Sequence, residues 1–245
     1  MRLDQAIAAR FPNISRRKAR ELLSQHRVLV NERPVSVASR TVAPTDRIVV
    51  VDAPAEIRIL QSTDQWLAVD KPAGLAIQPD RERTRRSVEE LLRLQLKREG
   101  VPHELYLVHR LDTGTSGVVV FARSRNAAAN LSAAFAEGAM RKVYVAVVEG
   151  LVDSAVTIDT PVREKPALTL VRPLQPSQFG TLVEAEPKTG RTHQIRVHLS
   201  SIKHPVVGDR RYGSTVNAPR LMLHAQRLEH PLIGSIESPV PPDFV

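Results

Sequence analysis

The sequence predicts an α+β protein in which a small module of helices and strands precedes a larger domain with a mixed, largely antiparallel sheet. Strand-like runs and apolar residues at helical spacing alternate along the 245 residues. Basic charge is concentrated at one end, because residues 1–52 hold 10 Lys+Arg and 5 Asp+Glu, a net of +5 within the total of +9. Pro54 closely follows the strand-like run that ends this stretch, so we expect two domains, residues 1–52 and 53–245.

The first domain is expected to begin with two helices. Leu3 and Ile7 lie on one helical face, and Ser15 is a good N-cap for a second helix. The apolar side of that second helix is formed by Ala19, Leu22 and Leu23. Strands are expected at residues 28–30, at Val35 and at residues 48–51, with a turn at residues 31–34.

The other side of the second helix is basic. It carries Arg16, Arg17, Lys18 and Arg20. Cations on one face can contact phosphates and give affinity that falls with salt, although the same side chains also suit an ordinary solvated surface. The sequence pI of about 10.4 favours an anionic partner, with nucleic acid first and an anionic membrane surface second.

The larger segment alternates strands and helices. A strand at residues 66–69 ends in a Pro-Gly turn at residues 71–74. Ser87 and Glu90 form a capping box that begins a helix. The other expected elements are strands at 105–108, 118–121 and 143–148, a helix at about 124–137 that Gly138 ends, a strand-like region at 151–190, and a helix capped by Thr192 that buries Ile195, Leu199 and Ile202.

Several classes of protein are excluded by composition and spacing. The chain has no Cys, which excludes disulfides, thiolate metal sites and thiol nucleophiles. Its longest apolar run has six residues, at 143–148, whereas a membrane span needs about 20. No apolar signal peptide stands at the start, so we expect a cytoplasmic protein. His193 and His198 are five residues apart rather than four, and phosphate-binding and dinucleotide-binding glycine motifs are absent. We therefore expect no metal, no cofactor and no membrane partner.

Two stretches could carry chemistry. Residues 109–117 place an imidazole, a cation and the carboxylate of Asp112 in a Gly-rich turn after a strand, although Asp112 could simply close that turn. Residues 190–198 place Arg191 just before the start of a helix, where a guanidinium could hold a carboxylate or a phosphate. The alternative for Arg191 is an ordinary surface arginine.

These stretches resemble two known families. Residues 1–52 resemble the αL RNA-binding motif of ribosomal-protein type, with Glu32 where that family usually has Gly. Residues 60–245 resemble the RluA-type pseudouridine synthases, with Thr113-Gly114 where many members carry a basic and an acidic residue. The second resemblance rests on four blocks in the family's order: AVDKPAGL at 68–75, HRLDTGTSG at 109–117, RKVYVA at 141–146, and GRTHQIRVH at 190–198 followed by HPVVGD at 204–209.

The resemblance implies an enzyme of the pseudouridine synthase fold that isomerises uridine in RNA without a cofactor. It implies that Asp112 is the essential residue, acting as nucleophile or as base, and that Arg191 is its ion-pair partner. Tyr144 matches the family's active-site tyrosine, which stacks on the flipped uracil and assists removal of the C5 proton. Arg110 matches the arginine that fills the gap left by the flipped base, and His109 precedes it among the expected RNA-contacting residues.

The RNA partner follows from the same resemblance, and two rival functions remain open. The αL module favours large-subunit ribosomal RNA as substrate, with transfer RNA as the alternative, and we expect a monomer. One rival is a catalytically silent RNA-binding protein of the same fold. A second rival is a glycosidase, which needs another carboxylate beside Asp112.

Overall fold

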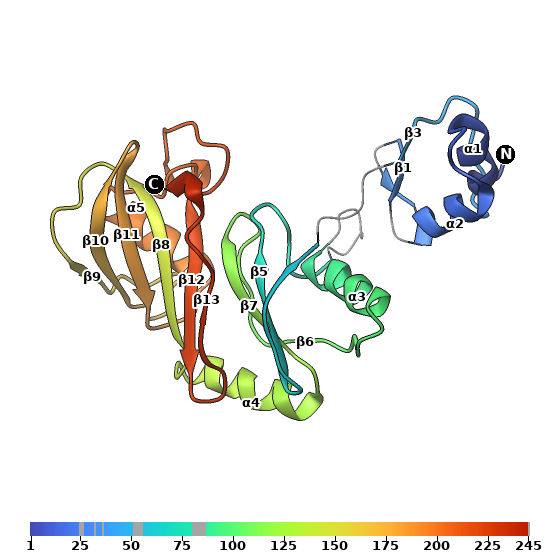
Figure 1. Cartoon of the computed structure of the whole chain (residues 1–245). Coiled ribbons are helices and arrows are strands. Elements are labelled where there is room, and N and C mark those ends of the chain that lie inside the picture. Colours follow the sequence, from blue (N-terminus) through green and yellow to red (C-terminus); the bar gives the residue numbers. More distant parts are fainter. Residues whose placement is uncertain (25–26, 32, 36, 51–55, 80–86, 245) are drawn as a thin grey trace. The chain divides into compact units, whose positions relative to one another are not determined.

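The computed structural model describes residues 1–245 except 25–26, 32, 36, 51–55, 80–86 and 245. The chain forms two compact units, the first made of residues 1–56 and 78–101 and the second of residues 57–77 and 102–245 (Figure 1). The expected domain boundary after residue 52 lies outside the described residues, and so does Glu32. None of the described helices is long and apolar enough to span a bilayer.

The first unit contains the expected helices and the strands expected at residues 28–30 and 48–50, but the strand expected at Val35 lies at Arg33–Pro34 instead, because these residues of the expected turn pair with Val30 and Leu29. Its helices are α1 (Leu3–Arg10), α2 (Arg16–Ser24) and α3 (Val88–Arg98), and its three-stranded antiparallel sheet has the order β2 (Arg33–Pro34), β1 (Val28–Val30), β3 (Ile48–Val50). The Ser87–Glu90 capping box is present at the start of α3. The apolar positions expected on α1 and α2 pack in one core with β1.

Asp4 organises the basic residues of the first unit. Its carboxylate is fully buried and accepts hydrogen bonds from Arg2 at 3.2 Å, Arg20 at 3.0 Å and Arg16 at 3.3 Å. Burial alone would raise the pKa of Asp4, but these guanidinium groups outweigh it and lower the pKa to about 2. About half of each arginine side chain stays exposed, so the cluster fixes three cations at the surface.

Asp4→Asn is expected to destabilise the first unit by about 2 kcal/mol, because it removes charge-assisted hydrogen bonds to a buried group. The folded-state pKa of Asp4 lies below its unfolded value near 3.9. The stabilisation is therefore complete above about pH 4 and disappears as the pH falls towards 2. Urea unfolding of both proteins at pH 7 and at pH 2.5 measures this: the difference between them should shrink at the lower pH, and an equal difference at both would contradict it.

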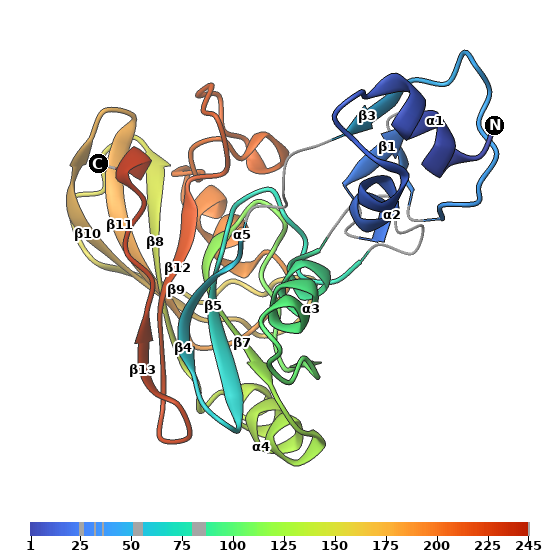
Figure 2. The ribbon, with the colours of Figure 1, turned by 45° about the vertical axis from the view of Figure 1, so that its right-hand side comes forward.

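The second unit is built on one ten-stranded sheet. Its main path runs β4-β5-β7-β12-β8-β11-β10-β9, with β6 paired to β7 and β13 to β12 (Figures 1 and 2). All pairs are antiparallel except β7 with β12, so the expected mixed, largely antiparallel sheet is confirmed. The strands are β4 (Arg58–Ser62), β5 (Trp66–Lys71), β6 (Tyr106–Leu107), β7 (Ser116–Ala122), β8 (Arg141–Glu149), β9 (Val156–Ile158), β10 (Thr169–Ser177), β11 (Gly180–Pro187), β12 (Leu223–His230) and β13 (Gly234–Glu237).

Two α-helices and two 3-10 helices complete the described part of the second unit. They are α4 (Arg125–Ala136), α5 (Gln194–Ser201), η1 (Arg210–Tyr212) and η2 (Pro242–Phe244). Ser124 caps α4, and Gly138 follows it with a φ of 75°. The expected Thr192 cap of α5 is wrong, because His193 occupies the N-cap position in a left-handed conformation and makes no side-chain cap.

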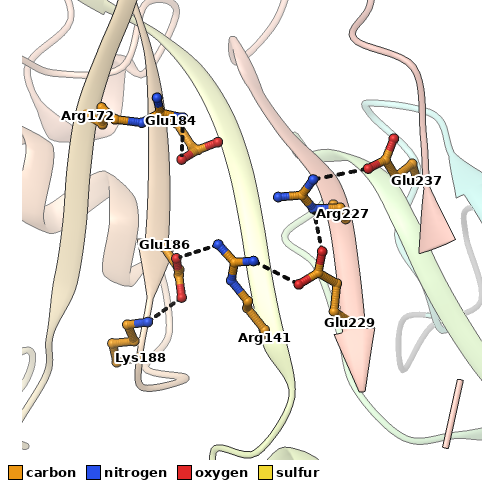
Figure 3. Close-up of polar contacts among 8 residues, drawn as sticks. All are labelled: Arg141, Arg172, Glu184, Glu186, Lys188, Arg227, Glu229 and Glu237. Atoms are coloured by element: carbon orange, nitrogen blue, oxygen red, sulfur yellow. Dashed lines mark hydrogen bonds and ion pairs between the residues drawn. The ribbon is translucent and has the colours of Figure 1, made fainter. Parts of the chain in front are cut away.

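β8 lies near the middle of the sheet and presents different residues on its two faces. On one face Arg141 forms ion pairs with Glu186 of β11 at 3.2 Å and with Glu229 of β12 at 2.9 Å (Figure 3). Arg227 continues the row to Glu229 and to Glu237 of β13. Such exposed pairs are each worth about 0–1 kcal/mol, so they mainly align the strands. Tyr144 lies on the opposite face of β8 from Arg141, and this face lines a cavity.

Candidate active site

A cavity of about 420 Å³ opens in the second unit. It is lined by the loop before β7, the C-terminal half of α4, the start of β8, the end of β11, the loop that leads into α5 with the first residues of that helix, and Leu223 at the start of β12. Its polar and charged lining includes His109, Arg110, Asp112, Tyr144, Arg191, His193, Gln194 and Arg196. Its size lies within the range of about 300–1,000 Å³ that is usual for small-ligand sites.

Asp112 lies in the loop between β6 and β7. Its carbonyl accepts from the Thr115 N–H at 3.1 Å, which makes the tight turn expected from the sequence. The neighbouring carbonyl of Thr113 accepts from the Gly74 N–H at 2.8 Å. At the start of β7, Gly117 has a φ of 114°, and a Cβ there would stand 2.2 Å from the carbonyl oxygen of Ala225. Only glycine lets β7 approach β12 this closely, so Gly117 anchors one end of the loop.

Lys71 is a supporting residue whose role was not predicted from the sequence. Its side chain is fully buried, and its Nζ donates to the carbonyls of Pro72 at 2.9 Å and Thr113 at 3.1 Å. Burial lowers the pKa of Lys71 to about 8, and the nearby charge of Asp112 acts in the opposite direction. Lys71 thereby ties the end of β5 to the loop that carries Asp112. A buried cation that donates only to backbone carbonyls has no distinctive sequence pattern.

The ion-pair partner of Asp112 is Arg196, which corrects the expected pair with Arg191. Arg196 Nη1 donates to Asp112 Oδ2 at 2.9 Å. Arg191 also lines the cavity, but its Nε donates to the carbonyl of Pro166 at 2.9 Å, and its side chain is exposed. The physical reason is the position of the helix start. α5 begins at Gln194, so Arg196 lies in its first turn facing the loop, whereas Arg191 precedes it.

Arg196 joins two carboxylates. Besides Asp112, its Nε and Nη2 donate to Asp209 at 2.6 and 2.9 Å, so the guanidinium is a bidentate partner for one carboxylate and a single donor to the other. Burial lowers the pKa of Arg196, but the hydrogen bonds to Asp209 and Asp112 outweigh it and raise the pKa above its ordinary value. Arg196 therefore stays charged beside Asp112. Asp209 is 2% exposed and serves to orient the guanidinium.

Tyr144 faces the same cavity from β8. Burial, and then the charge of Asp112, raise the pKa of Tyr144 above its ordinary value. The phenol therefore keeps its proton at neutral pH and can act as a hydrogen-bond donor. Together with Asp112 it provides an aromatic ring beside a carboxyl group.

His109 and Arg110 also line the cavity but differ in how they are held. The ring of His109 stacks on Phe135 with centroids 4.2 Å apart, and its Nε2 accepts from the Val120 N–H at 2.9 Å. Burial, assisted by the charge of Lys142, lowers the pKa of His109 to about 3, so its imidazole is neutral. Arg110 is exposed and forms no ion pair with any residue in the described ranges.

Gln194 is a further site residue that the sequence analysis missed. It is 4% exposed, and its amide oxygen accepts from the Arg191 N–H at 3.0 Å and from Thr189 Oγ1 at 2.6 Å. Its amide nitrogen donates to the Leu168 carbonyl and to Thr169 Oγ1, each at 3.0 Å. Gln194 thus holds the loop before α5 against β10, and with it the first turn that carries Arg196.

The site contains one reactive carboxylate rather than an acid pair or a metal cluster. Within the described ranges, no group of three or more His, Asp or Glu side chains is arranged to hold a metal ion. The second carboxylate near Asp112 is Asp209, and both of its oxygens accept from Arg196. This arrangement does not provide the free acid and base that a glycosidase needs, but it suits nucleophilic or basic chemistry at one carboxylate.

Comparison with known proteins gives concordant matches for both units. The RNA pseudouridylate synthase family model matches residues 65–201, and the S4 domain model matches residues 1–48. Ribosomal large subunit pseudouridine synthase D of Nitrosomonas europaea is 31% identical, over 100% of this chain and 82% of that protein. tRNA pseudouridine synthase C of Vibrio cholerae is 33% identical, over 71% of this chain and 86% of that protein. The structure of human RNA pseudouridylate synthase domain containing 1 aligns with a TM-score of 0.65 and 29% identity, over 77% of this chain and 84% of that one.

Proposed function

The chain belongs to the RNA pseudouridylate synthase family, and from this premise we propose that it converts specific uridines of large-subunit ribosomal RNA to pseudouridine. The chain is an RNA pseudouridine synthase with an N-terminal S4 domain. Ribosomal RNA is favoured over transfer RNA because relatives named for the large ribosomal subunit align with 100% of this chain, whereas the relative named for tRNA aligns with 71%.

One observation carries the catalytic proposal: Asp112 lies in the cavity at 2.9 Å from Arg196. The reaction breaks the N1–C1′ glycosidic bond, turns the uracil and joins its C5 to C1′. The C5 proton is lost to solvent and N1 gains a proton, so no cofactor is required. A carboxylate can assist as nucleophile at the sugar or as base, and both roles need its ionised form.

The target base has to leave its stack before it can reach Asp112. Flipping costs a few kcal/mol, least in loops and single strands. We assign the role of filling the gap to Arg110, whose exposed guanidinium lies next to the cavity and has no ion-pair partner among the described residues. Tyr144 is assigned to stack on the flipped uracil, since its ring lines the cavity beside Asp112.

Pseudouridine mapping in cells tests the target. Total RNA from cells with the wild-type gene and from cells with Asp112→Asn should differ at one or a few uridines of large-subunit ribosomal RNA. Differences confined to transfer RNA would overturn the ribosomal assignment, and no difference in any RNA would overturn the activity.

The basic face of α2 is proposed to contact RNA phosphates. Arg17 is exposed and forms no ion pair within the described ranges, whereas Arg16 and Arg20 share Asp4, and Lys18 pairs with Glu21 at 2.9 Å.

Arg17→Ala is expected to weaken RNA binding. It should also make the fall of log K with log salt less steep by about 0.7–0.9, the contribution of one neutralised phosphate. Arg172→Ala is the matched control, because it removes an exposed arginine from β10. Filter binding at salt concentrations from about 50 to about 200 mM measures both slopes. An unchanged slope for Arg17→Ala, or an equal fall in the control, would contradict the assignment.

A further inference from the structure

The two oxygens of Asp112 have different partners. Oδ2 accepts from Arg196 at 2.9 Å, whereas Oδ1 faces the Nε2 of His193 at 3.6 Å. The second distance is longer than a hydrogen bond, and such contacts often tighten when substrate closes the site. The oxygen that Arg196 leaves free is therefore the one beside an imidazole.

The ring of His193 is fixed from its other side. Its Nδ1 and the hydroxyl of Tyr212 are 2.8 Å apart, and the two rings meet edge to face with centroids 5.7 Å apart. Tyr212 is itself held between two cations, with the guanidinium of Arg196 5.0 Å and that of Arg211 5.7 Å from its ring centroid. A row of three side chains thus runs from the cavity to η1: Asp112, His193 and Tyr212.

The backbone at His193 is unusual in the same place. Its φ of 59° and ψ of 21° lie in the left-handed region, which residues other than glycine seldom adopt. Strained backbone of this kind gathers at functional sites, where the surrounding contacts enforce it. Here the clamp made by Gln194 holds the adjoining loop.

The other candidate proton acceptors in the cavity are poorly suited to the task. The phenol of Tyr144 keeps its proton because burial raises its pKa. His109 uses the lone pair of Nε2 to accept from the Val120 N–H. Lys142 also lines the cavity, and its Nζ donates to the Thr189 carbonyl at 3.2 Å. Among the other described Asp, His and Tyr side chains that line the cavity, Asp112 and His193 remain as a base and its neighbour.

We propose that His193 assists Asp112 in the reaction. Asp112 Oδ1 removes the proton from C5, and His193 Nε2 then takes that proton from Asp112. This inference rests on the proposed reaction at Asp112. When C5 has bonded to C1′, the C5–H bond breaks and its electron pair restores the C5=C6 double bond of the uracil. The C6=N1 pair then moves to N1, which takes a proton from solvent. The proton passes to Asp112 Oδ1 and then to His193 Nε2, and Asp112 is ionised again.

The charges around His193 suit a neutral acceptor. Burial lowers its pKa, Asp112 opposes that effect, and Arg196, Arg211 and Arg163 lower the pKa further. The neutral ring can carry its proton on Nδ1, donating to the Tyr212 oxygen, and leave Nε2 free. His193 also lines a second cavity, of about 330 Å³, together with Arg110, Asp112, Arg196 and Arg211. Protonated His193 can release its proton to water there.

The test is single-turnover tritium release from RNA labelled with tritium at C5 of uridine. His193→Ala should slow release by about 10²-fold, the lower end for acid–base assistance, while RNA affinity changes less than about threefold. Added imidazole should restore at least about a tenth of the lost rate, since it supplies a mobile acceptor.

Tyr212→Phe keeps the ring and loses its hydroxyl, so an effect of about tenfold is expected. Tyr106→Phe and His230→Gln, outside both cavities, are the matched controls.

The pH profile separates the proposed role from mere support of the fold. The wild-type rate should fall as acid protonates His193, at a pH below the ordinary histidine value of about 6.5, and His193→Ala should lack this dependence. If the alanine variant unfolds, His193→Gln carries the same test. A rate within threefold of wild type, or an unchanged pH profile without imidazole rescue, overturns the inference. Absence of tritium release by the wild type would instead overturn the proposed function.

Discussion

Asp112→Asn is expected to abolish pseudouridine formation, with a fall of about 10³-fold or more in the single-turnover rate, because an amide can act neither as nucleophile nor as base. The fold and RNA binding should survive, since the side chain is 23% exposed and the amide keeps its shape and an acceptor for Arg196. Nucleoside analysis of the reacted RNA measures the product directly.

Asp64→Asn is the matched control, because it makes the same change at an exposed position outside the cavity. It should retain the wild-type rate. Product formation by Asp112→Asn within about tenfold of wild type would mean that another group carries the chemistry.

Arg196→Lys is expected to lower the rate by about 10²–10³-fold, although it conserves the charge. A single ammonium cannot reproduce the fork that donates to Asp209 through two nitrogens and to Asp112 through a third. The two carboxylates then share one point charge, and Asp112 loses its fixed position. Single-turnover kinetics with saturating RNA measure the effect on the chemical step.

Arg191→Ala is the discriminating control, because Arg191 lines the same cavity and was the partner expected from the sequence. Its guanidinium donates to a backbone carbonyl and is exposed, so the rate should stay within about threefold. A larger loss in Arg191→Ala than in Arg196→Lys would reverse the assignment of the ion pair. Thermal unfolding of both variants checks that the fold is retained.

Much of the fold was predictable because local patterns and packing agree. The continuous apolar run at residues 143–148 predicted β8, and Ser87 with Glu90 predicted the start of α3, since both signals are local. The segment after residue 205 received no predicted elements, yet it provides β12 at the centre of the sheet. The pairing of β12 with β7 and β8 joins distant parts of the chain, and no local pattern reveals it.

The sequence predicted that Asp112 faces a cavity, as the structure shows, but the ion-pair partner predicted for it was wrong. A motif identifies residue types, but a change of one or two residues in the start of α5 decides which arginine faces the loop. The left-handed His193 moved that start beyond Thr192 and brought Arg196 to Asp112. Lys71 and Gln194 were missed for a related reason. Both act through hydrogen bonds to distant backbone groups, which only the folded chain brings into reach.

The most direct test of the central claim is the ratio of tritium released from C5 to pseudouridine formed, measured together on one labelled large-subunit RNA. If Asp112, paired with Arg196, isomerises uridine, the wild-type protein releases one tritium for each pseudouridine, and Asp112→Asn yields neither. Wild-type protein that forms no pseudouridine, or an Asp112→Asn variant that forms it at the wild-type rate, would contradict the account.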